Sequence, residues 1–267
     1  MAAERFRGRV VWITGASAGI GRELARVFAE EGASVAVSAR RGELLDGLVA
    51  ELEAAGGTAL AVPCDVTDEE AVAAAVARVV ERFGRLDVAV ANAGFGVTGA
   101  LESLGAAEWR RQLDVNVVGL ALTARHALPH LRASGGRLAL VGSAAGFLPA
   151  PGAGAYAASK AAVRSIGETL SAELRGSGVS CTTLHPGFVE SEIARVDNEG
   201  VHHPDAADRR PARLMWPTRR AAEAMVGAIH RRRREYVFTG HGRLGAFLGR
   251  HAPGLVQRLS PHLPRRG

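Results

Sequence analysis

The feature that most constrains the fold of this 267-residue chain is a regular alternation of segments over its first two-thirds. Short apolar runs of strand length alternate with longer stretches of helical periodicity. The runs expected to form strands are Val10–Ile13, Ser34–Ser38, Ala59–Val62, Val88–Ala91, Arg137–Val141 and Ser180–Leu184. The stretches expected to form helices are Arg22–Glu31, Glu43–Ala55, Glu69–Phe83, Ala106–Leu131 and Tyr156–Arg175. This order predicts an α/β fold with a doubly wound parallel sheet that is covered on both faces.

The alternation also suggests how the chain is divided. We expect one domain over residues 1–240 and a basic, amphipathic extension over residues 241–267. The regular pattern stops at residues 188–216, and a long irregular segment inside a compact domain is typical of a substrate lid loop. Helical periodicity returns at Ala221–Arg232, and Tyr236–Thr239 is a candidate last strand.

Composition narrows the class of protein. Hydrophobic residues make up 47% of the chain and charged residues 22%, which is an ordinary globular balance. Cys64 and Cys181 lie far apart without metal-ligand spacing, so no metal site is expected and nothing indicates an oxidising compartment. The N-terminus reads as neither a signal peptide nor a membrane span, and we therefore expect a cytoplasmic protein.

A glycine-rich turn, Thr14–Gly21, follows the first expected strand and leads into the first expected helix. Glycine allows a tight turn and a close approach of the backbone to a diphosphate. The start of the helix offers unpaired N–H groups and a dipole that favours anions. The turn therefore predicts a dinucleotide site, with an ordinary loop turn as the alternative. The expected contacts in it are Gly15, Ser17, Ala18, Gly19, Ile20 and Gly21.

The end of the second expected strand bears on the choice of dinucleotide. An acidic residue there would bind a ribose 2′-hydroxyl and repel a 2′-phosphate. Ser38 is instead followed by Ala39 and two arginines, and no acid occurs before Glu43. A guanidinium at Arg40, assisted by Ser38 or Arg41, suits a 2′-phosphate. We expect NADP(H) in preference to NAD(H), unless both arginines only begin a solvated helix face.

Tyr156 and Lys160 are four residues apart in a helical stretch, which places them on one helix face. A phenol titrates near pH ~10, and a neighbouring ammonium stabilises the phenolate and lowers that pKa. Lys160 is the only lysine among 33 lysines and arginines, and Tyr156 is one of only two tyrosines. The pair is therefore a candidate proton-transfer site, although a tyrosine packed beside a solvated lysine would have the same spacing.

Thr14–Gly21, Asn92–Gly94 and the pair of Tyr156 and Lys160 together resemble the signature motifs of the classical short-chain dehydrogenase/reductase family. The resemblance covers roughly residues 8 to 190, with the motifs in the family's order and spacing. It implies a Rossmann-type domain that binds NADP(H) or NAD(H) and assembles into a homodimer or homotetramer.

The resemblance also implies roles for individual residues. The catalytic set that it implies is Asn116, Ser143, Tyr156 and Lys160. Tyr156 would transfer the proton and Ser143 would orient the substrate oxygen, while Asn116 would hold a water that links Lys160 to solvent. Tyr156 and Lys160 would also contact the cofactor. The remaining implied cofactor contacts are Arg40, Arg41, Asp65, Val66, Asn92, Ala93, Gly94, Pro186, Gly187, Val189 and Ser191.

The sequence departs from the family pattern at two positions. Ala91 stands where asparagine is more usual, and Ser191 stands where threonine is commoner, which puts the hydrogen bond of Ser191 to a nicotinamide amide in doubt.

Apolar residues are expected around the reacting carbon, and they favour a small apolar carbonyl compound or secondary alcohol as substrate. They are Phe95, Ala145, Phe147, Leu148 and Phe188, with Trp216 closing over them. The same residues could equally serve as core packing. A non-catalytic dinucleotide sensor, or a structural subunit on the same fold, is the alternative to an enzyme. Such a protein would not need all four implied catalytic residues.

The net charge of +6 is concentrated at the C-terminus, because residues 231–267 contain nine arginines and only one acid, Glu235. Apolar residues interleave with arginines over residues 243–259. That pattern is typical of a segment on an anionic membrane or against a partner subunit. A solvated extension that covers the substrate entrance is the third interpretation. No groove-reading motif indicates nucleic-acid binding.

Overall fold

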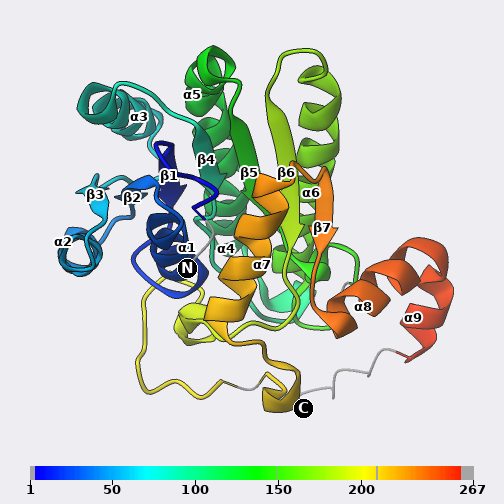
Figure 1. Ribbon diagram of the computed structural model, residues 1–267. Coiled ribbons are helices and arrows are strands. Elements are labelled where there is room, and N and C mark those ends of the chain that lie inside the picture. Colours follow the sequence, from blue (N-terminus) through cyan, green and yellow to red (C-terminus); the bar gives the residue numbers. More distant parts are fainter. Residues whose placement is uncertain (1–3, 149, 209, 260–267) are drawn as a thin grey trace.

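The computed structural model describes residues 4–148, 150–208 and 210–259, in which seven parallel strands form a sheet between layers of helices (Figure 1). The strands are β1 (Val10–Thr14), β2 (Ser34–Ser38), β3 (Thr58–Ala61), β4 (Val88–Ala91), β5 (Arg137–Val141), β6 (Ser180–His185) and β7 (Glu235–Val237). Their order is β3-β2-β1-β4-β5-β6-β7, and every pairing is parallel. The predicted doubly wound α/β fold is confirmed.

The helices are α1 (Gly19–Glu30), α2 (Gly42–Ala54), α3 (Glu69–Phe83), α4 (Ala106–Leu113), α5 (Gly119–Ser134), α6 (Gly154–Glu173), α7 (Thr218–His230), α8 (Gly240–His251) and α9 (Pro253–Leu259). Helices α1, α2 and α7 bury residues such as Phe28, Leu48 and Met225 against one face of the sheet. Helices α3, α5 and α6 cover the other face. Both faces are covered, which explains why the strands read as continuous apolar runs. None of the helices in the described residues is long and apolar enough to cross a membrane.

The order in which the chain adds strands to the sheet reverses between β1 and β4. The chain moves outward from β1 to β2 and β3, then returns to place β4 on the other side of β1. The connections at the carboxyl ends of β1 and β4 therefore diverge to opposite faces, and a crevice opens between them. This crevice positions the site described below.

The structure corrects the prediction of one helix over Ala106–Leu131. Helix α4 ends at Leu113, a π-helical turn covers Asp114–Val118, and α5 starts at Gly119. The wider turn presents the Asn116 side chain to the backbone of Phe95. A Cβ on Gly119 would lie 2.6 Å from Val66 Cγ2. The start of α5 therefore packs closely against the segment between β3 and α3.

Helix α8 packs on the body of the protein through a face of small residues. Gly242 and Gly245 are buried, and a Cβ on Gly245 would lie 2.1 Å from Leu148 Cδ1. A Cβ on Gly249 would lie 2.1 Å from the carbonyl oxygen of Phe147. The small-residue face thus fixes α8 against the loop that follows β5.

A buried polar chain secures the same helix. His185 at the end of β6 is fully buried, and its Nε2 lies 3.2 Å from Glu235 Oε1. Arg250 of α8 donates to the other oxygen of Glu235. The Phe147 ring lies 4.7 Å from the His185 ring and 4.7 Å from the Arg250 guanidinium carbon. The contacts of His185 and Arg250 lower the pKa of Glu235 to about 2, although burial acts in the opposite direction.

The pKa of Glu235 gives a prediction for stability. A carboxyl whose folded-state pKa lies below its ordinary 4.5 stabilises the folded chain above that pH, and the stabilisation is lost as the pH falls towards 2. We expect E235Q to lower the free energy of unfolding by about 1–2 kcal/mol at neutral pH, since the side chain is partly exposed and its contacts are screened. Urea unfolding should show this difference shrinking below pH ~4.5. A difference that stays constant from pH 7 to 3 would contradict the assignment.

Candidate functional site

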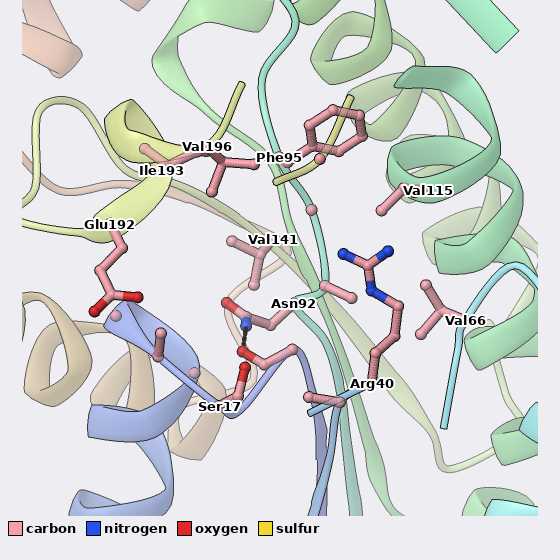
Figure 2. A pocket seen from close by; sticks show the side chains of 18 of the residues that line it. Ser17, Arg40, Val66, Asn92, Phe95, Val115, Val141, Glu192, Ile193 and Val196 are labelled. Carbon is pink, nitrogen blue, oxygen red and sulfur yellow. Dashed lines mark hydrogen bonds between the residues drawn. The ribbon is translucent and has the colours of Figure 1, made fainter. Parts of the chain in front are cut away.

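The carboxyl ends of the strands open onto a cavity of about 640 Å³ (Figure 2). Most of the residues predicted from the sequence to contact a cofactor line it. They are Gly15, Ser17, Ala18, Gly19, Ile20, Gly21, Arg40, Arg41, Asp65, Val66, Asn92, Ala93, Gly94, Tyr156, Lys160, Pro186 and Ser191. Gly187 and Val189 lie outside the lining. Gly187 packs against Thr239 and His241, and Val189 is buried and pairs with Trp216.

The glycine turn is packed too tightly for any side chain at two positions. A Cβ on Gly15 would lie 2.6 Å from Ala93 Cα, and one on Gly21 would lie 2.2 Å from the Gly15 carbonyl oxygen. Gly15 and Gly19 also have φ values of +68° and +53°, a region that favours glycine. The turn therefore lies flat under the cavity, and a ligand can approach its backbone closely.

The N-terminus of α1 lines the cavity and is a candidate anion-binding site. Its N-cap residue, Ala18, has no side-chain acceptor, and no acid occurs in the first turn. The first N–H groups of the helix therefore lack a side-chain cap, and the helix dipole favours a negative charge beside them. This is the arrangement expected for a diphosphate.

Asn92 joins the ends of β1 and β4 beneath the turn. Its Nδ2 donates to the carbonyl oxygens of Thr14 and Gly15 at 3.0 and 3.1 Å. The Thr14 hydroxyl in turn accepts the N–H groups of Asn92 and Ala93. These bonds satisfy the buried polar groups where the two strands diverge and hold the crevice at a fixed width.

Two arginines at the end of β2 lie at one end of the cavity. Figure 2 shows the exposed Arg40 side chain extending into the cavity beside Val66. Arg40 forms no ion pair within the described residues. Arg41 donates to Ser17 Oγ at 3.0 Å. Ser38, suggested from the sequence as a helper, is buried and accepts the Trp12 indole N–H at 2.9 Å, so it cannot assist.

Asp65 lines the cavity beyond the third strand. Its Oδ1 accepts both the N–H and the hydroxyl of Thr67, at 3.0 and 2.8 Å. These two bonds hold the Asp65 carboxylate at the cavity wall through one of its oxygens.

Tyr156, Lys160 and Ser143 come together at the inner end of the cavity. The Ser143 side chain is close enough to the Tyr156 phenol to lower its pKa. Lys160 Nζ lies 5.8 Å from the centre of the Tyr156 ring and donates to the Val141 carbonyl oxygen at 3.0 Å. Ser143 is buried just outside the cavity lining, and its hydroxyl also accepts the Ala145 N–H.

The electrostatics of this group differ from the expectation. Burial raises the pKa of Tyr156, while the Ser143 hydrogen bond and the charge of Arg210 oppose the rise. Burial also lowers the pKa of Lys160 to about 8. The expectation that Lys160 would lower the pKa of Tyr156 is therefore wrong for this arrangement. Desolvation outweighs the effects of Ser143 and Arg210, and Lys160, whose ammonium donates to the Val141 carbonyl, is not among the groups that shift the pKa of Tyr156.

Asn116 lies behind the pair and is fully buried. Its Nδ2 donates to the Phe95 carbonyl and to Ser159 Oγ, both at 3.0 Å, and its Oδ1 accepts the Phe95 N–H. A Cβ on Gly94 would lie 3.0 Å from Asn116 Oδ1 and 3.4 Å from Lys160 Nζ. Only one lone pair of Oδ1 remains for the water-holding role implied by the resemblance.

The segment 188–216 covers the cavity, and the sequence did not identify its contacts. Lining residues from this segment, besides Ser191, are Glu192, Ile193, Val196, Glu199, Gly200 and His202. Figure 2 shows Ile193 and Val196 facing the cavity from above. Asn198 fastens the segment across the opening through two amide hydrogen bonds of 2.9 Å to the backbone of Thr98. Arg111 adds a bond to the Asn198 carbonyl.

Several residues expected to surround the substrate pack elsewhere. Phe95 lines the cavity. Phe147 and Leu148 pack against α8, and the Phe188 ring stacks on His241 at 5.2 Å. Trp216 packs on the core beside Phe238 instead of closing over the site. The expectation failed because the packing of α8 on this loop depends on contacts between segments that are distant in the sequence.

Residues 9–202 match the family model for short chain dehydrogenases. The chain belongs to the short-chain dehydrogenase family. It is 37% identical over 225 residues to a cis-4-hydroxycyclohexanecarboxylate dehydrogenase of Sinomonas cyclohexanicum, covering 84% of this chain and 90% of that protein. It is 35% identical over 190 residues to a 3beta-hydroxysteroid dehydrogenase of Mediterraneibacter gnavus, covering 71% and 69%.

Solved structures in the same family share the fold closely. A short chain dehydrogenase/reductase of Burkholderia phymatum in complex with NAD is 29% identical with a TM-score of 0.83, and the match covers 98% of this chain and 99% of that chain. A short chain dehydrogenase of Burkholderia cenocepacia in complex with NADP is 32% identical with a TM-score of 0.76, covering 86% and 96%. Members of this dehydrogenase family thus bind either nicotinamide dinucleotide.

The residues of this chain fit such a cofactor. The turn that carries Gly15 and Gly21 leaves room for a diphosphate against the backbone, and the uncapped N-terminus of α1 favours its charge. The cavity continues from Arg40 at one end to Tyr156 and Lys160 at the other. It is therefore both shaped and charged for an extended dinucleotide.

The glycine turn yields a prediction with a matched control. Gly15 and Gly56 both have positive φ, but only Gly15 has a neighbour within 4 Å of an added Cβ. We expect G56A to cost about 1 kcal/mol of stability without changing dinucleotide affinity. G15A should cost more and weaken dinucleotide binding by about tenfold or more, since Ala93 must move. Calorimetric binding and thermal melts of both variants check this; equal effects on binding would contradict it.

Proposed function

We propose that the protein is an NADP(H)-dependent oxidoreductase that interconverts a carbonyl and a secondary alcohol on an apolar small molecule. Tyr156 serves as its general acid and base. The main support is that Tyr156, Ser143 and Lys160 lie close together at the inner end of a cavity that is lined by the glycine turn. A non-catalytic dinucleotide sensor would need the glycine turn but not this group.

The chemistry divides between the cofactor and the chain. A bound nicotinamide dinucleotide supplies or accepts the hydride. In reduction, the Tyr156 hydroxyl donates its proton to the carbonyl oxygen as the alcohol forms. The Ser143 hydroxyl, which lies beside the phenol, orients that oxygen. The raised pKa of Tyr156 keeps it protonated at neutral pH, as an acid must be.

Lys160 acts on the phenolate that remains. Its pKa of about 8 keeps it mainly charged at neutral pH, yet makes it a proton donor of moderate strength. Its Nζ is held by the Val141 carbonyl at 3.0 Å within the same cavity wall. Asn116 bonds the Phe95 backbone and Ser159, the residue before Lys160, and offers one oxygen lone pair for a relay to solvent.

The lid and the cofactor preference belong to the same proposal. Residues 188–216 form the substrate lid. Ile193 and Val196 of this segment face the cavity, and these apolar side chains would exclude water from the reacting atoms. NADP(H) is preferred because Arg40 extends into the cavity without an ionic partner in the described part of the chain. Asp65 and Val66 line the same cavity and would border the adenine of a bound dinucleotide.

Relatives support a ring-bearing substrate. The names of two of them specify a hydroxycyclohexanecarboxylate and a hydroxysteroid, both with the hydroxyl on a saturated ring. Phe95, Val97 and Ala155 form a small apolar cluster next to Tyr156, with Trp109 and Val196 packed on it. We therefore propose an alicyclic secondary alcohol or the corresponding ketone, handled by a homo-oligomeric enzyme.

The role of Tyr156 can be tested with the chain's other tyrosine as control. Y156F should lower turnover of a cyclic alcohol by about a hundredfold or more while NADP affinity stays within about twofold. Y236F changes the tyrosine of β7, whose ring stacks on Phe238, and should keep turnover near that of the wild type. Substantial residual turnover in Y156F, measured through dinucleotide absorbance, would refute the assignment.

The cofactor preference rests on Arg40. R40A should raise the KM for NADPH by about tenfold or more, because one charge-assisted contact to a 2′-phosphate is lost. The KM for NADH should change little, since that dinucleotide has a hydroxyl at the position. Parallel steady-state assays with both cofactors decide the question; an equal rise for both would assign Arg40 to general binding and reject the preference.

A further inference from the structure

Helices α8 and α9 present an apolar surface that the rest of the chain does not cover. Leu244 and Phe247 of α8 are 61% and 60% exposed, and Leu255 of α9 is 48% exposed. These three lie within twelve residues, whereas only five other large hydrophobic residues in the described part of the chain are comparably exposed. The cluster is therefore a feature of this hairpin and not of the surface in general.

The hairpin has two distinct faces. The face with Gly242, Gly245 and Gly249 packs on the protein body, as described above. Leu244 and Phe247 are three residues apart and occupy the outward face, together with exposed Arg243 and His251. The Phe247 and His251 rings lie 4.8 Å apart on that surface. Packing of the inner face thus fixes the direction in which the apolar side chains point.

The charge around this outward face is of one sign. No acidic residue follows Glu235 in the sequence, and residues 231–267 carry eight net positive charges. Glu235 is already paired with Arg250. Exposed Arg243 and Arg258 have no acidic partner among the described residues. A surface of this kind combines protruding apolar groups with uncompensated guanidinium groups.

We propose that the outward face of α8 and α9 docks on an anionic lipid bilayer. Leucine and phenylalanine side chains enter the boundary between headgroups and acyl chains, while arginines reach the phosphates. A second copy of the chain fits less well. A two-fold contact would bring Arg243 and Leu244 of both copies together and leave the arginine charges without acids.

The position of the hairpin links docking to the site. The inner face of α8 contacts Phe147 and Leu148, in the loop that starts at Ser143. Figure 1 shows α8 at the same end of the strands as the segment that follows β6. If the proposed function holds, a docked bilayer adjoins the mouth of the cavity, where an apolar substrate can enter from the lipid. Docking itself does not depend on that function.

Flotation of the full-length protein with vesicles tests the proposal. Two vesicle compositions are compared: neutral vesicles of phosphatidylcholine alone, and anionic vesicles of phosphatidylcholine with phosphatidylglycerol. The test variant is L244E/F247E, which changes only exposed side chains. The control is L44E, because Leu44 is 43% exposed on α2, at the opposite end of the strand order from α8. Light scattering reports the solution mass of each protein, and circular dichroism confirms that each remains folded.

We expect the wild type and L44E to float with the anionic vesicles at least about tenfold more than with the neutral ones. L244E/F247E should lose at least about nine-tenths of that binding. Absence of wild-type flotation, or equal flotation of the double variant, would overturn the proposal. A lower solution mass for L244E/F247E without wild-type flotation would assign the face to a second copy and overturn it equally.

Discussion

The junction between β1 and β4 is the constraint on which the rest of the site depends. Asn92 bonds the carbonyls of Thr14 and Gly15, and the Thr14 hydroxyl binds the backbone beyond β4. These contacts bring Gly15 against Ala93 so closely that no side chain can intervene. The turn is therefore held close to the end of β4, and α1 starts directly after it. The cavity opens between β1 and β4, where the strand order reverses. Without this close junction the turn would not present its backbone to a ligand in the cavity.

Burial sets the electrostatics at the other end of the cavity. Lys160 is 4% exposed, and Tyr156 is half-buried with its ring against the segment that carries Gly96. Desolvation moves both groups towards their neutral forms, raising the pKa of Tyr156 and lowering that of Lys160 to about 8. A lysine that exchanges its proton near neutrality and a tyrosine that stays protonated suit a proton relay. The same burial explains why a planar guanidinium would fit poorly in a chain that otherwise uses arginine throughout.

The sequence predicted the regular elements well because their signals are local. Strands covered on both faces must be apolar throughout, so the runs at Val10, Val88 and Leu138 stand out. The glycine turn and the Tyr156–Lys160 spacing were likewise readable, since each depends on a few neighbouring residues. All of these came together around one cavity.

The features that were missed depend on contacts between distant segments. The π turn at Asn116 exists because the side chain bonds Phe95, which periodicity cannot reveal. Ser38 seemed free to bind a phosphate, yet it is buried and its oxygen accepts the indole N–H of Trp12 on the neighbouring strand. Phe147 and Phe188 seemed to face the substrate, but both pack against helix α8. Lid residues such as Val196 have no local motif at all.

The central claim is that the only lysine of the chain lies buried in the dinucleotide cavity beside Tyr156. Selective ¹⁵N labelling of lysine gives a single Nζ resonance, because Lys160 is unique in the sequence. Its pH titration measures the pKa of Lys160 directly. We expect a midpoint near pH 8 and a change in the resonance when NADP is added. A midpoint near the ordinary 10.5, unaffected by the dinucleotide, would show that Lys160 is solvated and does not lie in the cavity.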